Sequence, residues 1–115
     1  MSSEAKKSLF IALTNPVEGK DAEYNDWYTN THLDEVVAVK GFISARRYKL
    51  AQAQYIKDQP FQYVAIYEVE SGKGQEIIDN LTGAIDKMTV LPVIDMDKGT
   101  GFLVESICDT VVRKS

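Results

Sequence analysis

The sequence contains few residues of several types, and each shortage excludes some classes of protein. Its 115 residues include one cysteine, one histidine and three prolines, with 13 lysines and arginines against 17 aspartates and glutamates. The lone Cys108 excludes a disulfide within the chain, which is typical of a protein in a reducing compartment. A formal net charge of −4 departs from the basic excess that nucleic-acid binders carry. We therefore predict a cytoplasmic protein with no nucleic-acid partner.

Long apolar runs are also missing. The first run, residues 9–13, has five residues and follows a polar start, so it is too short for the apolar part of a secretory signal. No stretch approaches the roughly 20 apolar residues that cross a bilayer. We expect no membrane partner. At this length the chain is predicted to form one domain, residues 1–115, in which residues 1–6 are flexible.

The residues that are present predict four strands and two main helices. A first helix is expected between Asp21 and Gly41, and a second between Gly74 and Leu91. The predicted strands, rich in β-branched and aromatic residues, are residues 9–14, 42–50, 62–70 and 102–112. The order βαββαβ is typical of the ferredoxin-like fold. We therefore predict an α+β protein with a four-stranded antiparallel sheet and both helices on one face.

Both faces of the predicted sheet carry apolar side chains. Along residues 62–70, Tyr63 and Tyr67 lie on one face, whereas Val64 and Ile66 lie on the other. Two helices can cover only one of these faces. We predict that a second copy of the chain covers the other, giving a homodimer through the sheet faces. The alternative is that these side chains are exposed singly on the surface.

His32 is the only histidine, and the ordinary pKa of histidine lies near neutrality. On a helix, Tyr24, Trp27 and Tyr28 form an aromatic face, and His32 lies at its edge beside Tyr28 and Asn25. An aromatic concavity with one titratable group is typical of a small-molecule site. We predict that His32 is a general base, oriented by Tyr28 or Asn25, and that the aromatic residues bind substrate. The competing interpretation is a histidine near a helix end, beside aromatic core residues.

Arg46 and Arg47 are adjacent in a predicted strand, so they point to opposite faces of the sheet. One interpretation is structural, an ion pair with Glu68 or Glu105 on a neighbouring strand. The other is an arginine that binds a carboxylate or enolate of the substrate, a role that we give to Arg47. Which arginine faces the pocket stays open.

Metal and thiol chemistry have little support in the sequence. His32 and Glu35 share a helical face, but a single histidine without paired cysteines is a poor set of metal ligands. Cys108 lies in a predicted strand, where we expect a small buried residue and not a nucleophile. We predict no metal and no cofactor.

The stretch from Asn15 to Tyr48 resembles the EthD-like branch of the dimeric α/β-barrel superfamily. Its mark is a first helix with an aromatic pair followed by a histidine, here Trp27, Tyr28 and His32, and then a second strand that begins at a glycine, Gly41. The resemblance implies a homodimer whose sheets face each other. It also implies a pocket between the sheet and the helices of each subunit.

Three functions follow from these observations. The first is a cofactor-independent enzyme that acts on an apolar oxygenated or aromatic metabolite, with His32 transferring a proton in lyase, isomerase or monooxygenase chemistry. The alternative is a non-catalytic ligand-binding or stress-related homodimer. The third is a structural dimer whose core is filled and has no pocket. Substrate identity and the need for a partner enzyme stay open.

Overall fold

The structure is a computed structural model that describes residues 4–114. Its strands are β1 (Ser8–Thr14), β2 (Phe42–Lys49), β3 (Tyr63–Val69) and β4 (Thr100–Glu105). Its helices are α1 (Asp21–Trp27), the π-helix η1 (Tyr28–His32), α2 (Leu33–Val37) and α3 (Gly74–Ile85). Because α1, η1 and α2 follow one another without a gap, the first predicted helix is one continuous helical segment.

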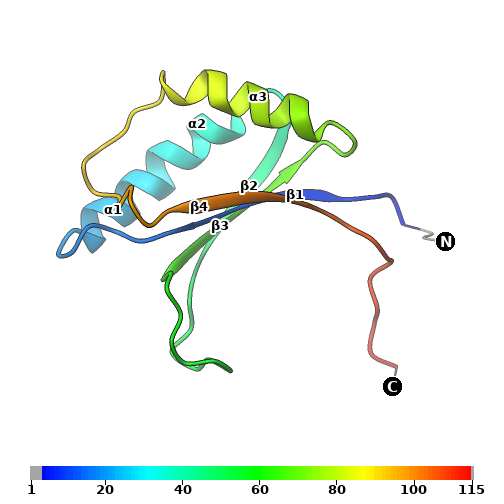
Figure 1. Ribbon diagram of the computed structural model, residues 1–115, viewed down its shortest axis with the longest axis horizontal. Helices are drawn as coiled ribbons and strands as arrows, with labels where there is room; N and C mark the ends of the chain where they lie inside the picture. Colours follow the sequence, from blue (N-terminus) through cyan, green and yellow to red (C-terminus); the bar gives the residue numbers. More distant parts are fainter. Residues whose placement is uncertain (1–3, 115) are drawn as a thin grey trace.

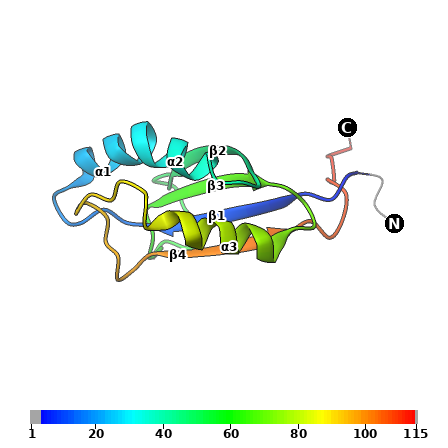
Figure 2. The ribbon, with the colours of Figure 1, turned by 90° about the horizontal axis from the view of Figure 1, so that it is seen from above.

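The four strands form one antiparallel sheet in the order β2-β3-β1-β4. All helices lie on one side of this sheet (Figure 1). Seen from above, α3 lies over β1 and β4, and the α1–α2 segment lies beside it (Figure 2). The predicted α+β ferredoxin-like fold is confirmed. Among residues 4–114, no helix is long and apolar enough to cross a membrane.

The helix-covered face of the sheet holds the core. Tyr67 in β3 lies opposite Phe10 in β1 and Ala45 in β2, so these three side chains share that face. Tyr24 from α1 and Ile77 from α3 pack onto it and are almost completely buried. The core is therefore a single aromatic-rich layer between sheet and helices.

Gly41 sets the approach of the first helical segment to α3. It lies in the turn between α2 and β2 with a φ of +100°, which residues with a side chain rarely adopt. A Cβ atom at this position would lie 2.8 Å from Cγ1 of Ile77. The turn thus requires glycine both for its backbone conformation and for the closeness of α3.

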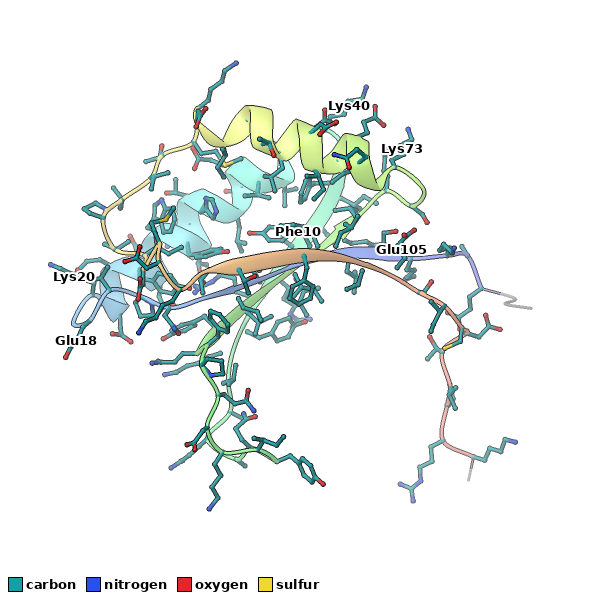
Figure 3. All side chains as sticks on the ribbon, in the orientation of Figure 1. Phe10, Glu18, Lys20, Lys40, Lys73 and Glu105 are labelled. Atoms are coloured by element: carbon teal, nitrogen blue, oxygen red, sulfur yellow. The ribbon has the colours of Figure 1, made fainter. Side chains whose placement is uncertain are left out.

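The other face of the sheet is apolar and has no helix over it (Figure 1). By strand register, it carries Leu9, Ile11, Leu13, Val64, Ile66, Phe102 and Val104. We call these seven residues the open face. Phe102 is 43% exposed, whereas charged side chains such as Glu18, Lys20 and Lys73 project from turns elsewhere (Figure 3).

The last strand is shorter than predicted. It ends at Glu105, whereas the sequence predicted residues 102–112. β4 is an edge strand that pairs only with β1, and β1 begins at Ser8. The backbone N–H of Ser106 still donates to the carbonyl of Lys7, but the strand pairing ends there. Residues 106–114 leave the sheet toward the side of the open face (Figure 1). Cys108 is consequently exposed, and its predicted burial is wrong.

The predicted flexible segment, residues 1–6, lies partly outside the described residues, which begin at Glu4. The backbone N–H of Glu4 donates to Oδ1 of Asp109 at 3.0 Å, and its Oε1 accepts from the backbone N–H of Thr110 at 2.6 Å. The two ends of the described chain are therefore joined by hydrogen bonds.

Candidate active site

The first helical segment changes its winding just before the candidate histidine. The backbone N–H of Leu33 donates to the carbonyl of Tyr28, five residues earlier, which defines the π-helical turn η1. On a regular α-helix, residues five apart lie about 140° apart around the axis. The wider turn instead brings Trp27 and His32 onto one side. Their rings stack with centroids 4.7 Å apart and planes inclined by 24°.

His32 is held between aromatic rings. Besides the stack on Trp27, the ring of Tyr28 meets it edge-on at 4.9 Å between centroids. The Nδ1 atom of His32 is buried and has no hydrogen-bond partner among the described residues. Tyr28 thus contacts His32 through the rings, and its role in orienting the imidazole stays a prediction.

The surroundings keep the imidazole neutral. Burial lowers the pKa of His32 below its ordinary value of about 6.5, and the positive charge of Arg47 lowers it further. The carboxylate of Glu35 acts in the opposite direction. Because the lowering prevails, the ring is uncharged at neutral pH and has one nitrogen able to accept a proton.

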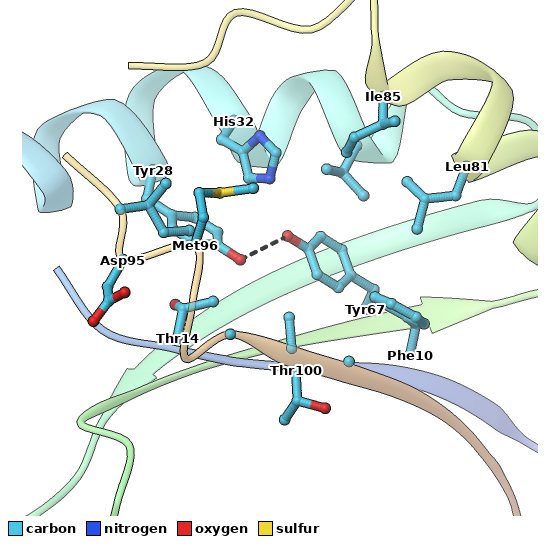
Figure 4. A pocket seen from close by; sticks show the side chains of 15 residues that line it. Phe10, Thr14, Tyr28, His32, Tyr67, Leu81, Ile85, Asp95, Met96 and Thr100 are labelled. Atoms are coloured by element: carbon cyan, nitrogen blue, oxygen red, sulfur yellow. Dashed lines mark hydrogen bonds between the residues drawn. The ribbon is translucent and has the colours of Figure 1, made fainter. Parts of the chain in front are cut away.

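A cavity of about 380 Å³ lies between the sheet and the helices, with His32 in its wall (Figure 4). Its wall is largely apolar and includes Phe10, Val36, Leu81, Ile85, Ile94 and Met96. A cavity of this size holds a small organic molecule. The hypothesis of a structural dimer expected no pocket beside His32, whereas this structure has one there.

The loop after α3 closes one side of the cavity. Pro16 and Ile94 form an isolated β-bridge, and the backbone N–H of Asp95 donates to the carbonyl of Asn15 at 2.9 Å. These bonds fix the loop to the end of β1 and place Met96 beside His32 (Figure 4). No pattern in the sequence indicates this contact, because a loop gives no periodic signal for what it covers.

Two phenol groups enter the cavity from opposite elements. Tyr28 comes from η1 and Tyr67 from β3, and their hydroxyl oxygens lie 3.5 Å apart (Figure 4). Both residues are almost fully buried, and burial raises the pKa of each hydroxyl above its ordinary value. Both therefore keep their protons at neutral pH. Tyr67 was not among the predicted site residues, because only the strand register places it opposite η1.

Tyr24 and Trp27, predicted to bind substrate, lie outside the lining of this cavity. Tyr24 is fully buried, and its hydroxyl forms a hydrogen bond with that of Thr14. The indole N–H of Trp27 donates to the carbonyl of Thr89 at 2.8 Å. Both side chains thus support the cavity wall from behind.

Arg47 and Asn25 also lie outside this cavity, in a separate polar depression lined by residues of α1, η1, β2 and β3. Arg47 donates to Oδ1 of Asn25 at 3.0 Å and to the hydroxyl of Thr29 at 2.8 Å. Its guanidinium lies 4.5 Å from the ring centre of Tyr28 and 5.3 Å from that of Tyr63. Arg47 therefore faces the helices and touches the back of the Tyr28 ring.

The predicted ion pair of an arginine with Glu68 or Glu105 is wrong. Arg46 faces the side of the open face and is exposed, with Ile66 opposite it in β3. Among the described residues, the ion pairs join Lys20 to Glu23 and Lys73 to Glu70. Arg47 has neutral partners on the first helix in place of a carboxylate.

Glu35 is the carboxylate that acts on His32. Its Oε2 accepts from the backbone N–H of Thr89 at 2.8 Å, whereas its Oε1 is buried without a hydrogen-bond partner among the described residues. Over residues 4–114, no three histidine, cysteine, aspartate or glutamate side chains come close enough to hold a metal ion.

No family model matches the sequence, and no curated protein matches it significantly. Solved structures do match. An EthD family protein from Bacillus halodurans C-125 aligns with a TM-score of 0.51 and 14% sequence identity, over 88% of this chain and 99% of that one. The chain has the fold of an EthD family protein.

Two further structures share this fold. At3g17210 from Arabidopsis thaliana aligns with a TM-score of 0.62 and 12% identity, over 92% of this chain and 99% of that one. A protein from Shewanella loihica PV-4, described as a putative monooxygenase, aligns with a TM-score of 0.50 and 13% identity, over 96% of this chain and 97% of that one. The predicted resemblance to EthD-like proteins is confirmed at the level of the fold, and at these identities the likeness reaches no further.

Proposed function

We propose that the protein binds a small, apolar, oxygenated molecule in the cavity beside His32 and moves a proton on it without a cofactor. The observation that carries this proposal is the place of the one histidine. Its ring lies in the wall of an apolar cavity of about 380 Å³, in surroundings that keep it neutral. A neutral imidazole facing a bound apolar molecule is suited to general base catalysis. The fold shared with an EthD family protein and with a protein described as a putative monooxygenase supports small-molecule chemistry.

The proposed step removes a proton from a carbon atom next to a carbonyl group. The nitrogen lone pair of His32 takes the proton, the electron pair of the C–H bond forms a C=C bond, and the C=O π pair moves onto oxygen. The products are an imidazolium and an enolate. Return of a proton from the imidazolium to carbon, after exchange with solvent, completes an isomerisation or an exchange reaction.

We also propose that the chain forms a homodimer through the open face. Its seven apolar side chains lie on the side of the sheet that no helix covers. Two segments extend on that same side, the loop 50–62 and residues 106–114 (Figure 1). They carry strongly exposed apolar residues, among them Tyr55, Ile107 and Val111. A second copy would bury these side chains together with the open face.

The test is hydrogen exchange on 1-tetralone, an apolar ketone with exchangeable protons next to its carbonyl. We expect wild-type protein in D₂O at pD 7 to speed deuterium incorporation above the buffer rate, as followed by NMR of the ketone. His32→Gln keeps a polar side chain of similar size but cannot act as the base. We therefore expect its catalysed exchange rate to be about 10²-fold lower than that of wild type.

The matched control is Gln75→His, which puts an imidazole on the exposed surface of α3 while keeping His32. If surface histidine accounts for the exchange, this variant exchanges faster than wild type. Equal rates for wild type and His32→Gln contradict the proposed proton transfer. Binding of 1-tetralone without deuterium exchange would contradict the proposed catalysis and support a ligand-binding protein.

A further inference from the structure

The two phenols in the cavity are short of a hydrogen-bond acceptor. An ordinary O–H···O bond is about 2.7–2.8 Å long, whereas the hydroxyl oxygens of Tyr28 and Tyr67 lie 3.5 Å apart. Neither hydroxyl has another partner among the described residues. At most one of the two protons is used, and only weakly, although both side chains are almost fully buried. Buried phenols usually find a good partner.

We propose that Tyr28 and Tyr67 together bind one carbonyl oxygen of the ligand, so that the cavity selects neutral ketones, aldehydes or esters on an apolar skeleton. This inference rests on the proposed function and adds the chemical class of the ligand and a new binding residue, Tyr67. An oxygen placed about 2.8 Å from both hydroxyl oxygens accepts a bond from each. Rotation of the O–H bonds is enough to aim both protons at it.

The rest of the lining explains why the ligand is neutral. Among the residues that line the cavity there is no lysine or arginine, His32 is uncharged and Asp95 is the one acidic residue. A ligand carboxylate would enter this apolar space without a cation to pair with it, which is costly. A carbonyl group carries no net charge but accepts two hydrogen bonds.

The same pair of donors fits the proposed reaction. When a proton leaves the carbon next to the carbonyl, negative charge develops on the oxygen that the phenols hold. Donors fixed in an apolar site stabilise such charge without reorganising. The guanidinium of Arg47, 4.5 Å from the centre of the Tyr28 ring, adds positive charge behind that phenol.

The test compares two ligands that differ by one oxygen, 1-tetralone and its hydrocarbon tetralin. Dissociation constants are measured for wild type and Tyr67→Phe by NMR titration or calorimetry. We expect Tyr67→Phe to weaken the binding of 1-tetralone about tenfold, because only the ketone loses a hydrogen bond. The binding of tetralin should be unchanged or slightly tighter. Comparing the ratio of the two constants between proteins cancels the different solubilities of the ligands.

Three further measurements keep the result interpretable. Tyr28→Phe should change the two dissociation constants as Tyr67→Phe does. Tyr63 is a buried phenol outside the cavity, so Tyr63→Phe should change the dissociation constant of neither ligand. The infrared C=O band of bound ¹³C-labelled 1-tetralone should lie at lower frequency in wild type than in either cavity variant, since each donor weakens the C=O bond. Tetralin binding reports that a variant keeps its cavity.

The outcomes separate this inference from the proposed function. If both ligands lose affinity equally in Tyr67→Phe, or neither does, the shared carbonyl site is overturned, while exchange that depends on His32 would still support proton transfer. If the ketone alone loses affinity but no exchange occurs, the carbonyl site stands and the proton transfer falls. Failure of wild type to bind either ligand overturns both.

Discussion

At the scale of single residues, the site depends on one imidazole held uncharged by its neighbours. Trp27 stacks on the ring of His32, Tyr28 meets it edge-on, and its Nδ1 atom has no hydrogen-bond partner among the described residues. These contacts remove water from the ring without placing an anion in hydrogen-bond contact. The protonated form is therefore disfavoured, and a base is available at neutral pH.

This arrangement predicts how stability responds to acid. The pKa of His32 is lowered in the folded protein, so the unfolded chain binds its proton more readily. The free energy of unfolding of wild type should therefore fall as pH drops below the ordinary histidine pKa of about 6.5. Glutamine does not titrate, so His32→Gln should lose less stability than wild type between pH 8 and pH 5.

Urea denaturation of both proteins at the two pH values measures this difference, because all other titrating groups are shared. If wild type loses no more stability than His32→Gln on acidification, the imidazole is not held neutral by the fold.

At the scale of elements, the π-helical turn and the turn at Gly41 set the geometry of the site. The wheel of a regular α-helix predicted His32 beside Tyr28 and Asn25. His32 does contact Tyr28, but the hydrogen bond of η1 that spans five residues also turns it onto Trp27. Asn25 binds Arg47 and not His32. The sequence carries no propensity signal for a π turn, which is rare and occurs mostly as a single turn within an α-helix.

A pair of glycine substitutions tests the turn between α2 and β2. Gly41→Ala places a side chain at a φ of +100° and 2.8 Å from Ile77, so we expect a loss of roughly 1–2 kcal/mol or more in the free energy of unfolding. Gly83→Ala in α3 meets nothing within 4 Å and should gain about 1 kcal/mol from helix propensity.

Chemical denaturation of the two variants beside wild type measures the change in the free energy of unfolding for each, a loss for Gly41→Ala and a gain for Gly83→Ala. A neutral Gly41→Ala would show that this turn does not hold α3 against the first helix.

The elements themselves were largely readable from the sequence. Alternation and helical stripes predicted four strands and two helices in the right order, because burial on one face imposes those periods. The end of β4 was missed, since Ile107 and Val111 continue the strand pattern while β1 offers no partner there. The cavity was predicted only through His32 and Tyr28. Tyr67, Met96 and Phe10 come from other elements, and only the register and the loop path bring them together.

At the scale of the whole molecule, the two faces of the sheet differ in what lies over them. One face, under the helices, holds the cavity. The other, the open face, carries seven apolar residues without a covering element. A surface of this kind is typical of a subunit interface. The cytoplasmic location and the homodimer stay predictions.

The proposed homodimer is tested by a charge in the open face. Phe102 is 43% exposed, so Phe102→Asp leaves the core of the single chain intact but places a carboxylate in the proposed interface. We expect wild type to have the mass of a dimer by light scattering and Phe102→Asp to have that of a monomer. Val90, 54% exposed in the loop after α3, provides the matched control, and Val90→Asp should remain dimeric. A monomeric wild type contradicts the interface.

The most direct measurement for the central claim is NMR of the imidazole itself. The chain has one histidine, so its ¹³Cε1–¹Hε1 signal needs no assignment. We predict that this signal titrates with a midpoint below 6.5 and that 1-tetralone shifts it in a saturable way at pH 7. A midpoint at or above 6.5, with a signal that saturating 1-tetralone leaves unmoved, would contradict a neutral base beside the bound ligand.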